Sequence, residues 1–404
     1  EVPDHWESRR LKFLFSLQKR PVVDGDGIVT CFRDGAVTLR SNRRTDGFTN
    51  AEKEIGYQGI RKGDLVIHAM DAFAGAIGVS DSDGKSSPVY SACTPNEGVS
   101  AYYFARLLRH MALAGFVSSL AKGIRERSTD FRWSDASEIC LPLPSISEQT
   151  QIARFLDHET ARIDALIEEQ QRLIELLKEK RRGIVLSALS DTSLPLVRIG
   201  HAVDVISRPV KQREDESYTP IGLFNRDRGL FHKEPREMQD MGDSDFFWIK
   251  SGDLIISGQF AWEGAVAMAG ESEEGLVVSH RYPVLRGKHG VANTEYLYAI
   301  LTTKHGDFLL NESSRGAAGR NRPLNLAALL KEKIRIPSKE IQEQVSNLVQ
   351  NEAKVLTECR QQISLLQERR SALISAAVTG KIDVRGWQPA AHSQAPESAV
   401  AEAH

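Results

Sequence analysis

Apolar residues recur every three or four positions over two long stretches of the chain, one near its middle and one near its end. In the first stretch, at 147–189, the spacing alternates between four and three residues. A repeat that averages 3.5 residues keeps one apolar stripe facing a partner helix, which is the pattern of a coiled coil. At 1.5 Å per residue this stretch predicts a helix of roughly 65 Å, too long for one ordinary globular domain.

The second half of the chain repeats this pattern. Ile152 and Val345 hold the same place in the two patterns, 193 residues apart, and a proline precedes each stretch. The helix ends also match, since LLKEKRRGIVLSA from Leu176 resembles LLQERRSALISAA from Leu365, here 189 residues further on. We therefore predict that the two helices pair with each other. An antiparallel pair is favoured because the residues between the helices can supply the turn.

The predicted contact between the helices uses one apolar stripe on each. Its members are Ile152, Leu156, Ile163, Leu166, Leu173, Leu177, Val345, Val349, Leu356, Ile363, Leu366 and Leu373. We expect the charged outer face, which includes Lys178 and Arg182, to be in solvent. The basic run at 178–182 lies near a helix C-terminus, where cations are favourable.

The segments outside the helices repeat as well. IRKGDLVIHAMDAFAGAIGV from Ile60 resembles IKSGDLIISGQFAWEGAVAM from Ile249, and each has a Gly-Asp turn before a short β-branched strand. Next come two amphipathic segments, AYYFARLLRHM from Ala101 and TEYLYAILTTK from Thr294, which predict one helix in each half. A loop rich in Gly and Arg follows in both halves.

These patterns predict a mixed α/β protein with a pseudo-two-fold internal repeat. We expect two globular domains, at 1–143 and 192–336, separated by two long antiparallel coiled-coil helices, at 144–191 and 337–385. The last residues, 386–404, are rich in Ala, Pro, Ser and Glu, and we expect them to be disordered. Ser145 and Glu148 have the spacing of a capping box at the start of the first helix.

Composition narrows the class of protein. The formal net charge is −2, which excludes a globally basic nucleic-acid binder but leaves room for local basic surfaces. No apolar run is long enough for a transmembrane helix, and there is no secretion signal. The four cysteines form no CxxC pair, which is typical of buried thiols in a reducing compartment. We expect a cytoplasmic protein.

Two apparent catalytic motifs fail on their spacing. GVSDSDGKS at 78–86 has five residues between its glycines where a phosphate loop has four, and its aspartates would repel phosphate. His158 and Glu159 begin a zinc-protease pattern, but Arg162 stands where the second histidine belongs, so we interpret His158 as a surface residue. We predict no catalytic residue and no metal site on this chain.

Many basic residues lie in loops that also contain Gly or Asn. Arg is suited to pairing with guanine in the major groove, and Asn with adenine. A charged loop is often only a soluble loop, but its recurrence in both halves favours contact with phosphates or bases. The candidate DNA-contacting residues are Arg43, Arg44, Lys62, Arg125, Arg127, Arg132, Arg226, Arg228, Arg281, Arg315, Arg320 and Arg322.

Four motifs together resemble a known family. They are P-x3-E-Q-x2-I-A at 144–153, IDALI at 163–167, QRLIELLKEKR at 171–181 and AAVTGKID at 376–383. With the opening VPDHWESRRLKFLF, they resemble the specificity (S) subunit of Type I restriction–modification systems. The resemblance covers nearly the whole chain and leaves out only the tail after Trp387.

The resemblance implies a DNA-recognition subunit that is not itself an enzyme. Each globular domain would be a target recognition domain for one half of a bipartite site in double-stranded DNA, and the helices would be the spacer. Partners would be two methyltransferase (M) subunits and two restriction (R) motor-nuclease subunits. S-adenosylmethionine and ATP with Mg²⁺ would bind those partners and no cofactor would bind this chain.

Two other functions stay open from the sequence. A coiled-coil adaptor that binds only proteins would show no salt-dependent affinity for duplex DNA. A cryptic nuclease or nucleotide-binding enzyme would rest on the imperfect loop at 78–86 and would bind ATP. Because the two globular domains share little beyond their framework, we expect the two half-sites to differ.

Overall fold

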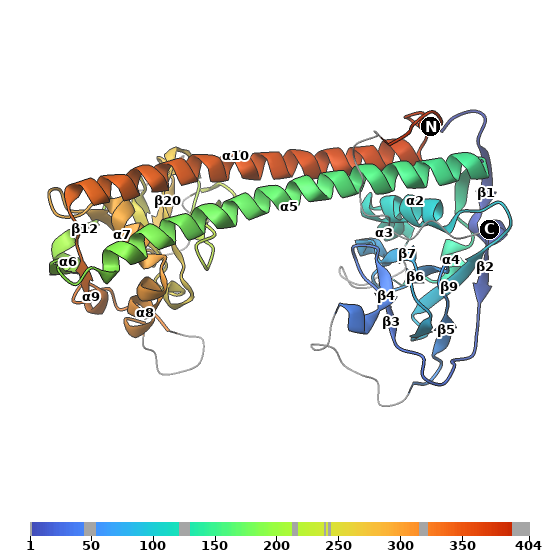
Figure 1. Ribbon diagram of the computed structural model, residues 1–404, viewed down its shortest axis with the longest axis horizontal. Coiled ribbons are helices and arrows are strands. Elements are labelled where there is room, and N and C mark those ends of the chain that lie inside the picture. Colours follow the sequence, from blue (N-terminus) through green and yellow to red (C-terminus); the bar gives the residue numbers. More distant parts are fainter. Residues whose placement is uncertain are drawn as a thin grey trace. The chain divides into compact units, whose positions relative to one another are not determined.

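The computed structural model describes residues 2–43, 54–120, 130–211, 217–237, 240, 244–314 and 322–389. It has two compact units: unit 1 is Glu1–Glu168 with Ile363–His404, and unit 2 is Glu169–Gln362. The long helices α5 (Ile146–Ser190) and α10 (Lys339–Val378) each contribute one segment to each unit. In both units the two helices lie side by side (Figure 1).

Unit 1 is built on a four-stranded antiparallel sheet with the order β2-β9-β6-β7. Its strands are β2 (Phe15–Gln18), β9 (Tyr90–Pro95), β6 (Leu65–His68) and β7 (Ile77–Val79). Three two-stranded sheets accompany it: β1 (Glu7–Arg10) with β10 (Cys140–Leu143), β3 (Val29–Cys31) with β4 (Val37–Leu39), and β5 (Gln58–Ile60) with β8 (Gly84–Ser86). The shorter helices are α1 (Leu11–Leu14), α2 (Ala101–Leu113), α3 (Phe116–Leu120) and α4 (Trp133–Ala136).

Unit 2 repeats this topology. Its four-stranded sheet has the order β12-β21-β18-β19, from Val203–Ile206, Val284–Gly287, Leu254–Ile256 and Val266–Met268. Its two-stranded sheets pair β11 (Leu196–Arg198) with β22 (Lys333–Arg335), β14 (Ile221–Leu223) with β15 (Leu230–His232), β17 (Phe246–Trp248) with β20 (Val277–Ser279), and β13 (Ser217–Tyr218) with β16 (Arg236–Glu237). Its short helices are α6 (Ile199–Ala202), α7 (Thr294–Leu301), α8 (Lys304–Glu312) and α9 (Leu326–Leu329). The predicted mixed α/β fold with an internal repeat is confirmed.

The β-branched strands predicted after each Gly-Asp turn are β6 and β18, and both are buried on two faces. Leu65 and Ile67 face helix α2 in the main core of unit 1, while Val66 belongs to a smaller core on the other face. In unit 2, Leu254 and Ile256 belong to the main core and Ile255 to the smaller one. A strand covered on both faces reads as a continuous apolar run, which explains the sequence pattern.

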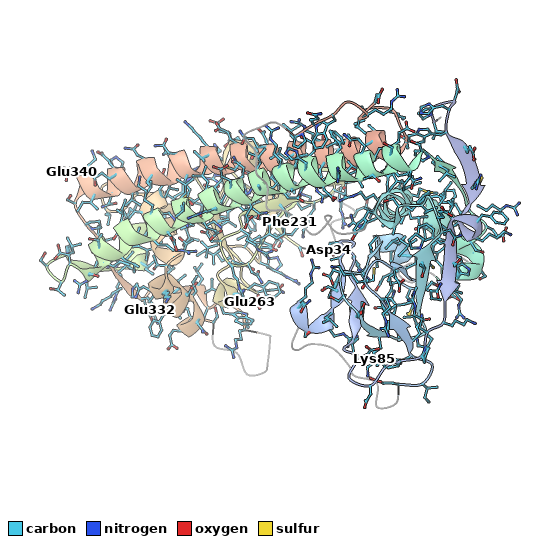
Figure 2. All side chains as sticks on the ribbon, turned by 45° about the vertical axis from the view of Figure 1, so that its right-hand side comes forward. Asp34, Lys85, Phe231, Glu263, Glu332 and Glu340 are labelled. Carbon is cyan, nitrogen blue, oxygen red and sulfur yellow. The ribbon has the colours of Figure 1, made fainter. Side chains whose placement is uncertain are left out.

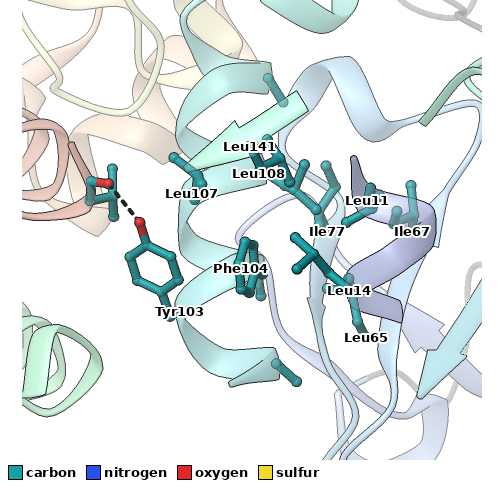
Figure 3. Close-up of a cluster of buried hydrophobic side chains, with 14 of the residues drawn as sticks. Leu11, Leu14, Leu65, Ile67, Ile77, Tyr103, Phe104, Leu107, Leu108 and Leu141 are labelled. Carbon is teal, nitrogen blue, oxygen red and sulfur yellow. Dashed lines mark hydrogen bonds between the residues drawn. The ribbon is translucent and has the colours of Figure 1, made fainter. Parts of the chain in front are cut away.

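The main core of unit 1 lies between the sheet, α2 and the long helices (Figure 3). On α2, Phe104 packs edge-on against Phe15 of the sheet, with ring centroids 5.6 Å apart. Neighbouring Tyr103 points the other way, and its hydroxyl donates a hydrogen bond of 3.0 Å to the carbonyl oxygen of Val378 in α10. Helix α2 therefore forms a middle layer that joins the sheet to the helix pair.

Glycine fixes one tight turn at the same place in both units. Gly75 has φ +88° and Gly264 has φ +69°, and each ends a 3-10 turn, η2 (Ala72–Ala74) or η4 (Ala261–Glu263). Only glycine adopts this left-handed conformation without steric cost. The repeated glycines therefore reflect a repeated backbone geometry.

The predicted capping box at the start of α5 is confirmed. The Glu148 amide donates to Ser145 Oγ at 3.3 Å, and the Ser145 amide donates to Glu148 Oε2 at 3.2 Å. No helix among the described residues is long and apolar enough to cross a membrane. The segment 390–404, most of the predicted tail, lies outside the described residues, whereas Trp387 packs on Phe155 with ring centroids 5.3 Å apart.

Candidate nucleic-acid interface

The structure describes seven of the twelve candidate DNA-contacting residues. Those outside the described residues are Arg44, Arg125, Arg127, Arg315 and Arg320. In unit 1, Arg43 pairs with Asp34 at 2.5 Å and Arg132 pairs with Asp130 at 2.7 Å, while Lys62 is exposed at the turn before β6. These three residues come from three separate segments. An acid partner would compete with DNA for both arginines.

In unit 2, two candidates share the turn that joins β14 to β15. Arg226 and Arg228 are exposed, and Asp227 between them is 8% exposed. The Arg228 guanidinium lies 5.2 Å from the centre of the Phe224 ring, and its Nε donates to the carbonyl oxygen of Asn225 at 3.0 Å. The turn therefore presents two cations outward while its acid points into the unit.

A third candidate, Arg281, lines a surface hollow of about 220 Å³ in unit 2. Two further cations, Lys233 and Arg236, line the same hollow. Among the described residues, its lining is Pro220, Ile221, Lys233, Arg236, Ser244, Phe246, Ser279, Arg281 and Tyr282. We call this feature the basic hollow; its described lining combines three cations, three hydroxyls and two aromatic rings without a carboxylate.

The cations of the basic hollow differ from other arginines nearby. Within the described part of the chain, the side chains of Lys233, Arg236 and Arg281 form no ion pair or hydrogen bond. By contrast, Arg208 and Arg286 both bind Asp253, at 2.7 Å and 2.5 Å. The basic hollow can therefore accept an anion without first breaking an internal ion pair. Burial raises the pKa of Tyr282, with Arg281 opposing, so its hydroxyl stays protonated and able to donate.

Arg322 lies apart from the basic hollow's lining, over the indole of Trp262 at 5.3 Å from the ring centre. The signal that identified the seven described candidates was a cation near Gly or Asn. That signal missed Arg236, which lies in strand β16, and the rings of Phe246 and Tyr282. Strand pairing brings these residues together from distant positions, which a local motif cannot reveal.

Several sequence interpretations of single residues are wrong. Lys178, expected in solvent, is buried at 9% exposure, and its neighbour Arg181, for which the sequence predicted no particular burial, is buried at 1%. His158 is only 14% exposed in its side chain and lies edge-on against Trp387. Cys140 is exposed, although the other three cysteines are buried as expected. We also expect a polar hairpin loop at 78–86 from the sequence, but this segment joins β7 to β8, which pair with β6 and β5 and not with each other, so it connects two sheets and is not a hairpin.

The predicted contact stripe of the helices is buried to different degrees. Buried members are Ile152, Leu156, Ile163, Val345 and Val349; partly buried members are Leu177, Leu356, Ile363, Leu366 and Leu373; Leu166 and Leu173 are each 40% exposed. Four of the five buried members belong to the main cores of the two units. A helix pair without a globular neighbour buries less, because each helix has only one partner.

No protein-family model matches the sequence, and no curated protein matches it. Among solved structures, the chain has the fold of Type I restriction–modification specificity subunits. It is similar to the S subunit from M. genitalium, with a TM-score of 0.53 and 15% identity over 93% of this chain and 97% of that one. It is also similar to a chain from a structure of the assembly and conformational transition of a type I R-M system, with a TM-score of 0.50 and 18% identity over 95% of this chain and 100% of that one. The resemblance indicated by the sequence motifs is thus confirmed at the level of the fold.

Proposed function

We propose that this chain is the DNA-specificity subunit of a Type I restriction–modification enzyme. The observation that carries the proposal is the duplicated topology, β2-β9-β6-β7 in unit 1 and β12-β21-β18-β19 in unit 2, within a fold like that of known S subunits. Two similar domains on one chain are suited to two DNA segments, because each domain can read its own half of a bipartite site.

Unit 2 offers two kinds of contact to DNA. The basic hollow would hold a backbone phosphate, because its three cations have no acid partner in the part of the chain that the structure describes. The exposed side chains of Arg226 and Arg228 on the β14–β15 turn would reach base edges, where an arginine can pair with guanine in two hydrogen bonds. Phosphate contact would supply affinity and the turn would supply part of the sequence preference.

The long helices would set the separation of the half-sites and recruit other subunits. Two methyltransferase subunits and two restriction subunits are the proposed partners, bound symmetrically because the chain repeats its own fold. Exposed leucines on the helices, Leu173, Leu176 and Leu365, are apolar surface of the kind that protein partners cover. S-adenosylmethionine and ATP with Mg²⁺ would bind the partner subunits, and this chain would direct catalysis without performing it.

Methylome sequencing tests the proposal directly. Cells would express the methyltransferase partner with and without this chain, and the methylated adenines would be mapped. We expect a bipartite methylated site with two different halves only when this chain is present. An active methyltransferase whose methylation pattern ignores this chain would refute the proposal and favour a protein-only adaptor.

A matched pair of variants tests the basic hollow. We expect Arg236→Ala with Arg281→Ala to weaken DNA binding for all sequences and to lower the slope of log K against log salt by about 1 to 2, roughly one unit for each phosphate that is no longer bound. The control removes two exposed lysines of α10, Lys339→Ala with Lys354→Ala, and so changes the net charge equally. Equal slopes for both double variants, measured by fluorescence anisotropy over a range of salt concentrations, would remove the basic hollow from the interface.

A further inference from the structure

A buried ionic cluster ties the long helices of unit 2 to the β14–β15 turn. Arg181 of α5 is 2% exposed in its side chain and lies between two carboxylates, Asp227 of the turn and Glu352 of α10. Its Nη2 donates to Asp227 Oδ2 at 2.5 Å, and its Nη1 donates to Glu352 Oε1 at 3.0 Å. The hydroxyl of Tyr298 on α7 donates to the other oxygen of Asp227. Four segments of unit 2 thus meet at one guanidinium.

The cluster fixes the turn in an unusual backbone conformation. Arg226 has φ +59° and Asp227 has φ +54°, and no other non-glycine residue among those described has a positive φ. Residues with a β-carbon are sterically disfavoured in this left-handed region, so surrounding contacts must hold them there. The backbone amide of Arg226 donates to the Glu263 carbonyl oxygen at 3.1 Å, and the Glu263 side chain also binds that of Asn225. Together with the Asp227 anchor, these contacts set the direction in which Arg226 and Arg228 leave the turn.

Stability alone is a poor explanation for the cluster. Arg181 Nε and Glu352 Oε2 are buried without a hydrogen-bond partner among the described residues, and burial raises the pKa of Glu352 although Arg181 opposes the rise. A buried ion pair with unsatisfied atoms is often no more stable than an apolar replacement. The cluster does, however, supply hydrogen bonds of defined direction, which an apolar replacement would lack.

Unit 1 has no such link between its turn and the long helices among the residues described. The corresponding turn joins β3 to β4 and contains Asp34 (Figure 2). The Asp34 side chain is 54% exposed and pairs with Arg43. Arg109 of α2 holds that turn through the carbonyl oxygen of Arg33 at 2.9 Å. Arg370 is the counterpart of Arg181 in the repeated helix ends, and it pairs with Asp164 of α5 at 2.8 Å. The two units share the fold, but among the described residues only those of unit 2 join the turn to both long helices.

We propose that Arg181 is a positioning residue: through Asp227 it couples the packing of α5 against α10 to the orientation of the turn that carries Arg226 and Arg228. This inference rests on the proposed function, since the turn is taken to read one half-site. It implies that a disturbance of the helix pair near Arg181 changes recognition of one half-site and leaves the other intact.

Asp227→Gly is the most informative variant. Glycine accepts the positive φ without strain, and Arg181 keeps Glu352 as a partner, so the unit can stay folded while the anchor is removed. We expect discrimination at one half-site to fall about tenfold, within the range expected for one mismatched base pair, with no change at the other. The full chain would be expressed with its methyltransferase partner, and the methylated sites would be mapped and scored base by base.

Arg181→Met is the second variant, and Arg370→Met is its matched control in unit 1. Both remove a helix arginine and its ion pair, but only the first touches the turn, so only the first should relax one half-site. A merely structural role would lower the thermal midpoint without changing base preference in the folded fraction. Hydrogen exchange at the turn, residues 225–229, should accelerate in Asp227→Gly and remain unchanged in Arg370→Met.

The possible outcomes separate the inference from the function on which it rests. Wild-type protein that directs no bipartite methylation would refute the proposed function and, with it, the coupling to DNA reading. Wild-type bipartite methylation with unaltered base preference in Asp227→Gly would overturn the inference alone. Relaxation of both half-sites would also overturn it, because the anchor lies only in unit 2.

Discussion

Asp64 and Asp253 are buried carboxylates at equivalent places in the two units, each directly after the glycine of a Gly-Asp turn. Arg20 binds Asp64 with both of its terminal nitrogens, and Arg208 does the same with Asp253 at 2.7 and 3.1 Å. Both Gly-Asp turns are visible in the sequence, but their arginines, which lie more than forty residues earlier, are not. The repeated arginines have no local motif around them, so only the fold reveals their role.

Asp253→Asn should destabilise unit 2. Burial alone would raise the pKa of Asp253, but hydrogen bonds from Arg208, the Lys250 amide and Arg286 outweigh it and lower the pKa in the folded state. The substitution leaves two partly buried arginines without their shared anion, which costs about 3 kcal/mol of unfolding free energy. Urea unfolding at neutral pH measures this loss, and a change below about 1 kcal/mol would contradict the role of the ion pair.

The pH dependence of that stability has a definite sign. A carboxylate whose pKa is lower in the folded state stabilises the fold above its unfolded pKa, near 3.9, and loses this contribution as the pH falls through the folded value. Wild-type protein should therefore lose more stability than Asp253→Asn as the pH falls from about 5 to about 3. Parallel pH profiles for the two proteins would show that another group controls acid unfolding.

The elements were largely predictable, because their signals are local. The apolar period located α5 at 147–189 against the observed Ile146–Ser190, and the matched pattern located α10. The repeat also located α2 and α7, although α7 ends at Leu301, before Thr303 caps the next helix. The apolar period could not reveal that a second side of α5, where Arg181 lies, is also buried. A seven-residue repeat identifies one contact face only.

Gly183→Ala should stabilise α5. Gly183 lies inside the helix, and a β-carbon added there would meet no atom within 4 Å. Glycine in a helix interior costs about 1 kcal/mol relative to alanine, so the variant should gain roughly that much. Gly78→Ala is the contrasting variant, since its β-carbon would come within 1.9 Å of the Gly35 carbonyl oxygen. A stabilised Gly78→Ala or a destabilised Gly183→Ala in urea unfolding would contradict these assignments.

At the scale of the whole molecule, duplication was visible in the sequence as offsets of 193 and 189 residues between matching segments. That observation predicted two similar units and their shared helices. It could not predict that the units differ in how the helices hold the β3–β4 and β14–β15 turns, because Asp227 and Tyr298 lie far from Arg181 in the sequence and share no motif with it. Under the proposed function, a duplicated fold with one asymmetric link would suit a chain whose two halves read different sequences.

The length of helices α5 and α10 should set the separation of the half-sites. Four residues inserted into α5 after Glu168 and four into α10 before Ile363 lengthen both helices together, at the boundary between the units. The added length is about 6 Å, at 1.5 Å per residue. With about 3.4 Å per base pair, the two half-sites should move apart by roughly two base pairs while their sequences stay the same. Methylome sequencing of this variant measures both the spacing between the half-sites and their sequences.

Insertion into α5 alone should abolish methylation, because the pair Asp164–Arg370 and the pair Arg181–Glu352 could not both be kept. An unchanged spacing in the double insertion would show that the helices do not set the distance between the half-sites.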